Sequence, residues 1–400
     1  MALNHLNEQL AIEVEELRAA GTYKRFEVLS SPQAAVVEMH GRGKVLVLSS
    51  SNYLGLANHP QVVEASMAGL ERYGAGTASV PFICGVFEPH IALAAELASF
   101  VGTEAAITYS SCWSANEAVI PTLTDDNTVI LSDELNHASI VDAIRLSRPA
   151  RKLVYRHSNM AVLEDALRSC EEDQRKLVVT DGVFSMEGDL ARLADIVELA
   201  RTYDAIVIVD DSHGTGVMGA SGRGVAEHFG VLGEVDVVTG TLGKALGGAG
   251  GGFVASSAVV CDVLAQRSRP QLFSNALPPA IACGALRAVQ LIREDPSLVT
   301  RLQDNARYFR AAITELGFKP LDGEAAIIPI IVRETAFAIR LSQRLLEERI
   351  FVTGFGYPVV PRDTARVRVQ MSAALERDHL ERALAVFTRV GQEMGLLNSS

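Results

Sequence analysis

Cysteine is scarce in this chain of 400 residues, and so is any regular cysteine pattern. The five cysteines are odd in number and widely scattered, and no two form a CxxC pair. This distribution argues against a disulfide framework and against a structural zinc site. We therefore expect no metal, and reduced thiols in a cytoplasmic protein.

Basic runs and long apolar runs are also missing. The formal net charge is -12, and no dense cluster of Lys and Arg occurs, so a nucleic-acid partner is not expected. Apolar runs such as residues 326–332 are too short to cross a bilayer, so no membrane partner is expected either. The first 21 residues predict an acidic amphipathic helix and lack the basic and apolar regions of a secretion signal.

What the chain does contain is enough apolar material for a large core. With 48% hydrophobic and 21% charged residues, the composition is typical of a soluble globular protein. The length favours one large domain and one smaller domain. We expect an N-terminal helix and extended segment over residues 1–55, a large domain over 56–290 and an α+β domain over 291–400.

Short apolar runs alternate with helical stretches through the large domain. The runs occupy residues 105–111, 128–133, 152–156, 176–182, 205–211 and 236–241. Continuous hydrophobic strands that alternate with helices predict an α/β fold with a parallel sheet covered on both faces. Ligands of such sheets bind beyond the carboxyl ends of the strands, where polar residues such as Asp181 and Asp210 follow the runs here.

The last quarter of the chain has a different rhythm. From about residue 301, long helical stretches alternate with the strand-like runs 326–332 and 366–371, which is typical of an α+β domain. We expect residues 398–400 to be frayed.

Lys244 follows an apolar run and lies among glycines in TGTLGKALGGAGGG. The segment lacks the spacing of a phosphate-binding P-loop, and GAGTAS at residues 74–79 lacks the third glycine of a dinucleotide-binding fingerprint. A turn lysine without function remains open. So does a desolvated, nucleophilic lysine that forms a Schiff base with a carbonyl cofactor.

Asp210 and His213 lie in VIVDDSHGTG, directly after a predicted strand. Burial penalises the charge of Asp210 unless a cation lies beside it, and the protonated ring nitrogen of pyridoxal phosphate (PLP) is such a cation. His213 could donate to the ring oxygen of the same cofactor. Taken singly, a helix-capping aspartate and a structural histidine are also plausible.

Motifs along nearly the whole chain resemble the α-oxoamine synthase family of fold-type I PLP enzymes, and most closely its glycine C-acetyltransferase branch. They include SSNYLGLANHP, YSSCWSAN, SDELNHASI, TDGVFSMEGD, VDDSHGTG, TGTLGKALGG, RSRPQLFSNALPPA and RVRVQMSAA. The resemblance implies a large domain with a mainly parallel seven-stranded sheet and a smaller C-terminal α+β domain.

The resemblance also implies roles for individual residues. Lys244 would bind PLP covalently and act as a base, Asp210 would hold the ring nitrogen, and His213 would bind the ring hydroxyl. His137 would stack on the ring and Ser185 would lie near its hydroxyl. The phosphate would be bound by Cys112, Trp113, Thr241 and the partner subunit's Ser274 in a homodimer with a shared active site.

Asn52 and Arg368 are implied as the pair that receives the amino-acid carboxylate, for which a guanidinium fork is well suited. Arg366 lies two residues away along the same predicted strand. We expect one of these two arginines to face the site and the other to face solvent.

The implied reaction joins an amino acid to an acyl-CoA and gives a 2-amino-3-keto acid, with glycine and acetyl-CoA as the first choice and threonine catabolism as its setting. Val80 and Phe82 favour an uncharged acyl group. Pro81 departs from the family's usual arginine, so a different amino acid or a longer acyl chain remains an alternative. A PLP aldolase or transaminase, which needs no CoA, is a second alternative.

Overall fold

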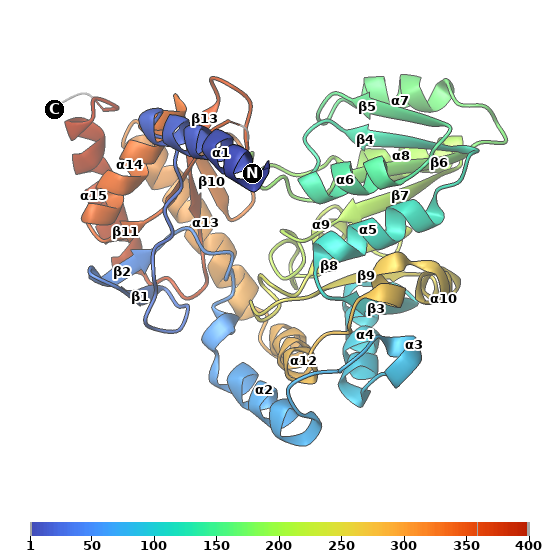
Figure 1. The fold of residues 1–400 in the computed structure, drawn as a ribbon. Helices are drawn as coiled ribbons and strands as arrows, with labels where there is room; N and C mark the ends of the chain where they lie inside the picture. The colour runs from blue at the N-terminus through green and yellow to red at the C-terminus, as the bar shows by residue number, and fades with distance from the viewer. Residues whose placement is uncertain (1, 358, 398–400) are drawn as a thin grey trace.

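The computed structural model describes residues 2–357 and 359–397; residues 398–400, for which we expected fraying, lie outside this part. Its centre is a seven-stranded sheet, as expected, with the strand order β3-β9-β8-β7-β6-β4-β5 (Figure 1). The strands are β3 (Ala105–Tyr109), β4 (Thr128–Asp133), β5 (Arg151–Tyr155), β6 (Arg175–Asp181), β7 (Ala205–Asp210), β8 (Val237–Thr241) and β9 (Gly252–Ser256).

Strand β9 is the one strand of this sheet that the apolar pattern did not indicate. It pairs antiparallel with both β3 and β8, whereas the pairs from β8 to β5 are parallel. Its five residues follow a run of glycines, so the sequence there is typical of a loop.

Side chains alternate between the two faces of the sheet, as the pleat requires. Ile130 packs in one buried cluster with residues of α5, α6 and α10, while its neighbours Val129 and Leu131 pack in another with residues of α4, α7, α8 and α12. Both faces are therefore covered, as the continuous apolar runs predicted. These helices are α4 (Glu88–Val101), α5 (Cys112–Leu123), α6 (Ala138–Leu146), α7 (Met160–Arg168), α8 (Leu193–Tyr203), α10 (Ala258–Arg267) and α12 (Pro279–Glu294).

The first helix and five further helical elements complete the N-terminal part and the large domain. Helix α1 (Ala2–Ala19) forms where the sequence predicted a helix and buries none of its residues. The others are η1 (Leu56–Asn58), α2 (Pro60–Tyr73), α3 (Pro81–Cys84), α9 (Val225–His228) and α11 (Arg269–Phe273).

The C-terminal region forms a smaller α+β unit beside the large sheet (Figure 1). Its antiparallel sheet has the order β10-β13-β12, formed by β10 (Ile327–Arg333), β12 (Thr353–Phe355) and β13 (Ala365–Gln370). The helices are α13 (Ser297–Glu315), α14 (Thr335–Glu347) and α15 (Arg377–Glu393). Helix α12 runs through residue 290, where we proposed the boundary between the domains.

A third sheet joins the two ends of the chain. Strands β1 (Val36–Met39) and β2 (Gly43–Val47) form a hairpin, and β2 also pairs in parallel with β11 (Ile350–Phe351). The extended N-terminal segment is therefore part of the same layer as the C-terminal unit.

All five cysteines are free thiols. Among the helices of the described residues, none combines enough length and apolar character to cross a membrane.

Candidate active site

A cavity of about 210 Å³ lies at the carboxyl edge of the large sheet. Eight of the eleven predicted site residues line it, and the other three, Asn52, Ser274 and Arg368, do not. The lining residues are Ser111, Cys112, Trp113, His137, Ser139, Asp181, Val183, Ser185, Asp210, Ser212, His213, Thr241 and Lys244. Ligand binding at this edge is what a parallel sheet predicts.

Lys244 follows β8 and is partly exposed where it lines the cavity. Burial lowers the pKa of its amine, an effect that the nearby Asp210 carboxylate opposes. No hydrogen bond or ion pair engages this amine within residues 2–357 and 359–397. The amine is therefore both desolvated and free to react.

Asp210 ends β7 and is buried. Its carboxylate accepts hydrogen bonds from Asn116 Nδ2 at 2.7 Å and from the Ser212 amide at 3.0 Å, and the Cys112 thiol lies 3.6 Å away. Thr239 Oγ1 donates to Asn116 Oδ1 at 2.8 Å and so fixes the amide's orientation. All these donors are neutral, so the carboxylate forms no ion pair with a side chain of residues 2–357 or 359–397. The sequence reasoning missed Asn116, although it lies within the YSSCWSAN motif.

A hydrogen-bonded chain connects Arg368 to His213. Arg368 Nη2 donates to Gln370 Oε1 at 3.2 Å, Gln370 Nε2 donates to Tyr53 Oη at 2.8 Å, and Tyr53 Oη lies 2.7 Å from His213 Nδ1. Because Tyr53 accepts from Gln370, its own proton is available for Nδ1. Burial, followed by the charges of Lys244 and Arg368, places the pKa of His213 well below its usual value.

A neutral His213 with an accepting Nδ1 carries its proton on Nε2, where it can donate into the cavity. This is the role that the resemblance implied for it. Tyr53 and Gln370 were not singled out from the sequence. Their signal was position alone, since Tyr53 follows Asn52 and Gln370 lies two residues after Arg368.

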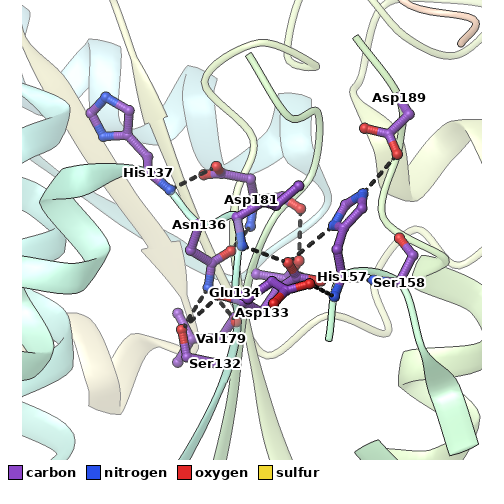
Figure 2. Close-up of polar contacts among 12 residues, drawn as sticks. Ser132, Asp133, Glu134, Asn136, His137, His157, Ser158, Val179, Asp181 and Asp189 are labelled. Carbon is purple, nitrogen blue, oxygen red and sulfur yellow. Dashed lines mark hydrogen bonds and ion pairs between the residues drawn. The ribbon is translucent and has the colours of Figure 1, made fainter. Parts of the chain in front are cut away.

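His137 precedes α6, and its exposed side chain lies at the cavity. Its backbone amide donates to Asp181 Oδ2 at 2.9 Å, and its Nδ1 lies 2.7 Å from Ser139 Oγ. Figure 2 shows this anchoring at the backbone, with the ring pointing away from the other labelled residues. Burial, and then the nearby Asp210, raise the pKa of Asp181 well above its usual value.

The N-terminus of α5 forms another wall of the cavity. Ser111 caps the helix by accepting from the Ser114 amide. A Cβ at Gly252 would lie 2.3 Å from the Cys112 amide nitrogen, so only glycine lets β9 pass this close. With Thr241 across the cavity, the helix terminus offers the free amides and positive dipole end that bind phosphate.

Arg366 and Arg368 correct one expectation. Residues two apart on a strand share a face, so they do not divide between site and solvent. Both contact the segment after β6: Arg368 Nη1 donates to Ser185 O at 2.9 Å, and Arg366 is buried in an ion pair with Glu187 at 3.0 Å. Arg368 Nε is buried without a protein partner in the described part of the chain.

Three predicted site residues do not line the cavity, and within the described part of the chain only one of them is hydrogen-bonded to a residue that does. Arg368 reaches the cavity wall through Ser185. Asn52 is buried, and its Oδ1 accepts from the Ala57 amide at 3.1 Å. Ser274 is the C-cap residue of α11 and does not line this cavity.

The segment around Pro81 lies apart from this site. Pro81 begins the short helix α3 and, with Phe82 and Val86, lines a second, mostly apolar cavity of about 440 Å³. The two cavities share no lining residue.

These features fit one kind of cofactor. The Lys244 amine, which has no hydrogen-bond partner in the described residues, could form a Schiff base with an aldehyde. The Asp210 carboxylate could bind a protonated ring nitrogen, and the amides at the N-terminus of α5 could bind a phosphate. Within the described residues no group of three or more His, Cys, Asp or Glu side chains is placed to hold a metal.

Known proteins share both the sequence and the fold. The model of the aminotransferase class I and II family matches residues 43–387. The chain is 44% identical to 2-amino-3-ketobutyrate coenzyme A ligase of Salmonella typhimurium over 98% of each protein. It is also 44% identical to 8-amino-7-oxononanoate synthase of Thermosipho melanesiensis, over 97% of the chain and 98% of that protein.

Solved structures agree with these matches. Serine palmitoyltransferase of Sphingomonas wittichii is 31% identical with a TM-score of 0.92, over 97% of this chain and 98% of that one. An SPT structure with PLP is 28% identical with a TM-score of 0.93, over 99% and 100% of the two chains. The chain belongs to the α-oxoamine synthase family of PLP-dependent, fold-type I transferases.

Proposed function

We propose that this enzyme condenses glycine with acetyl-CoA to give 2-amino-3-ketobutyrate and free CoA. The observation that carries the proposal is the pairing in one cavity of an uncommitted, desolvated Lys244 amine with an Asp210 carboxylate that has no cation of its own. The 44% identity to 2-amino-3-ketobutyrate coenzyme A ligase over almost the whole chain supports this choice of substrates.

Lys244 and Asp210 would hold PLP at its two reactive positions. PLP supplies an electron sink, which makes the α-proton of an attached amino acid acidic. Asp210 would keep the ring nitrogen protonated, and His213 would donate from Nε2 to the ring oxygen. Burial lowers the pKa of the Lys244 amine, which favours its neutral form, and the neutral amine would take the α-proton.

Arg368 and Asn52 would orient the amino acid through its carboxylate. The guanidinium donates to Ser185 O and Gln370 Oε1, and its buried Nε has no hydrogen-bond partner among the described residues. A carboxylate bound there would satisfy this group, and fixing the substrate in this way lowers the entropic part of the barrier.

The condensation itself exchanges a C–H and a C–S bond for a C–C bond. The glycine α-carbon gives its proton to Lys244 and attacks the thioester carbonyl, and CoA leaves as the thiolate. His137 lies at the cavity and would donate to the thioester oxygen as negative charge develops there. The choice of an uncharged acyl group rests on Val80 and Phe82 in the sequence, because the cavity that Phe82 and Val86 line shares no residue with the one that holds Lys244.

We further propose a cytoplasmic homodimer in which the partner subunit's Ser274 completes the phosphate site. The same product would place the enzyme in threonine catabolism.

A second candidate is the reaction of the relatives named 8-amino-7-oxononanoate synthase. Its specific support is the equal identity of 44%. The amino carbon in that name bears a methyl group, which indicates an amino acid larger than glycine and a longer acyl donor.

One experiment separates these candidates. The purified protein is titrated with glycine, alanine or serine while its visible absorbance is followed, and CoA release is then measured with acetyl-CoA and with longer acyl-CoAs. We expect the fastest CoA release with glycine and acetyl-CoA. Faster release with alanine and a long acyl-CoA would favour the second candidate, whereas a spectral response without any CoA release would favour an aldolase or a transaminase.

A further inference from the structure

A largely buried histidine outside the cavity lining is bound to carboxylates on both sides. His157 follows β5, and its side chain is 18% exposed. Its Nδ1 lies 3.0 Å from Asp133 Oδ1 and its Nε2 lies 2.8 Å from Asp189 Oδ2 (Figure 2). A carboxylate oxygen only accepts, so both contacts are satisfied together only when both ring nitrogens carry protons. His157 is therefore an imidazolium.

The charges around His157 are consistent with this state. Burial lowers its pKa, but hydrogen bonds and the negative charges of Asp133 and Asp189 outweigh burial and raise the pKa to about 10. Glu187 also lies near, but it is paired with Arg366 at 3.0 Å. The ring packs edge-on against Phe184 with centroids 4.3 Å apart, which further fixes its orientation.

One side of His157 connects to the loop that carries His137. Asp133, which ends β4, also accepts from the Leu135 amide at 2.9 Å and from the Ser158 amide at 3.0 Å. Ser158 has a φ of +51°, in the left-handed region, so this turn is held in a conformation that serine rarely adopts. Asp133 therefore fixes both the turn after β5 and the start of the segment that ends at His137.

The same loop is tied to the next strand of the sheet. Asn136 Nδ2 donates to Val179 O at 2.8 Å, and Asn136 Oδ1 accepts from the Asp181 amide at 2.8 Å. Asp181 Oδ2 in turn accepts from the His137 amide. The backbone position of His137 thus depends on the segment that Asp133 and His157 hold in place.

The other side of His157 connects to the loop over residues 183–190. Asp189 O accepts from the Phe184 amide at 3.0 Å and closes this loop at its base. Ser185, within the loop, lines the cavity and receives the hydrogen bond from Arg368. Gly188 (φ +75°) packs on β10, where a Cβ would lie 2.6 Å from Ile327 O.

We propose that His157 is a positioning residue that couples two parts of the active site: the segment that holds His137 and the loop that supports Arg368 of the C-terminal unit. The imidazolium joins these parts because each contributes one carboxylate, and neither carboxylate has another ion-pair partner in the part of the chain that the structure describes. The inference rests on the proposed roles of His137 and Arg368.

The test compares His157→Gln and Asp189→Asn with the control His228→Gln. His228 is also a partly buried histidine near a carboxylate, 3.6 Å from Glu324, but it does not line the cavity. Each variant is purified with PLP, and its visible absorbance, visible circular dichroism, glycine dissociation constant, kcat/KM and thermal unfolding are measured.

We expect both test variants to retain PLP but to show altered visible circular dichroism and weaker glycine binding. We expect kcat/KM to fall roughly 10- to 100-fold, the loss that follows when reacting groups are misplaced by about 1 Å. The control should match the wild type. The double variant His157→Gln/Asp189→Asn should be no worse than the more impaired single variant, because the two residues act through one contact.

Some results would overturn the inference alone. If both test variants melt at lower temperature but match the control in dichroism, glycine affinity and kcat/KM, His157 is only structural. If His157→Gln does not fold, Asp189→Asn decides the same question, because Asp189 is more exposed, at 33%. A wild-type protein without a visible band or a response to glycine would instead overturn the proposed function, and this inference with it.

Discussion

Two carboxylates at the same edge of the sheet differ in how the chain compensates their charge. Asp133 ends β4 and is paired with the His157 cation, whereas Asp210 ends β7, with β6 between the two strands, and is held only by neutral donors. A buried charge that the chain does not neutralise is costly, so it persists where a ligand provides the counter-charge. The difference distinguishes Asp210, which would bind the cofactor, from Asp133, which holds the backbone segments beside the cavity in place.

Removal of the one amine in the cavity should have the largest effect. We expect Lys244→Ala to abolish turnover, since loss of a base alone costs roughly 100- to 10,000-fold and covalent attachment of PLP is lost as well. Steady-state CoA release and the visible spectrum measure both consequences. A variant that still turns over at a tenth of the wild-type rate would remove Lys244 from its proposed role.

Asp210→Asn should separate activity from stability. We expect a loss of kcat of roughly 100- to 1,000-fold, the size expected when a preorganised charge is removed from a buried site. The cofactor-free protein should unfold at the same temperature as the wild type or higher, because an uncompensated buried carboxylate is gone. Near-normal activity would contradict the electron-sink argument.

The same substitution at Asp133 should have the opposite effect on the cofactor-free protein. Asp133→Asn leaves His157 with one partner, and breaking a buried ion pair costs about 3 kcal/mol of unfolding free energy. His157 has a pKa raised to about 10, so the stability it contributes is complete below about pH 6.5 and is lost as the pH rises through 10. Urea unfolding of both proteins between pH 6 and pH 10.5 should therefore show a difference that shrinks with pH. A constant difference would argue against a charged His157.

Arg368→Lys tests whether the Arg368 guanidinium, which does not itself line the cavity, binds the carboxylate of the amino acid. A lysine keeps the charge but loses the paired geometry, and a hydrogen bond to a charged group contributes about 1.5 to 3 kcal/mol. We expect KM for glycine to rise roughly 10- to 100-fold with a smaller change in kcat. An unchanged KM would place the carboxylate elsewhere.

Tyr53→Phe should have the smallest effect. It removes one link between Gln370 and His213, and a single neutral hydrogen bond contributes about 1 kcal/mol, or about fivefold in rate. The pH profile of kcat is the sensitive readout, because His213 would no longer be restricted to one tautomer. A profile identical to that of the wild type would show that Tyr53 does not set this tautomer.

The sequence predicted the parallel part of the sheet because each buried strand is a continuous apolar run, such as residues 205–209 before Asp210. It also predicted the cavity, because polar residues that end neighbouring parallel strands must meet. Residues that act through another side chain were not predictable in this way. Asn116 lies inside a helix and Tyr53 inside a loop, and only the folded chain shows that they contact Asp210 and His213.

The position of β9 and the direction of Arg366 show two other limits. Strand β9 is short and directly follows a run of glycines, which hides its three apolar residues, although its one glycine, Gly252, is what allows the Cys112 amide to approach. For Arg366 the error was one of strand geometry, because positions 366 and 368 lie on the same face. Pairing with Glu187, which is distant in sequence, is what keeps Arg366 from solvent.

Strand β2 is synthesised early, but its partner strand β11 is synthesised late. The Leu46 and Leu48 amides donate to the carbonyls of Arg349 and Phe351, some three hundred positions further along the chain. Until the ribosome has released that later segment, the β1–β2 hairpin has an open edge. The edge of β2 that faces β11 can therefore be paired only after synthesis has passed residue 351.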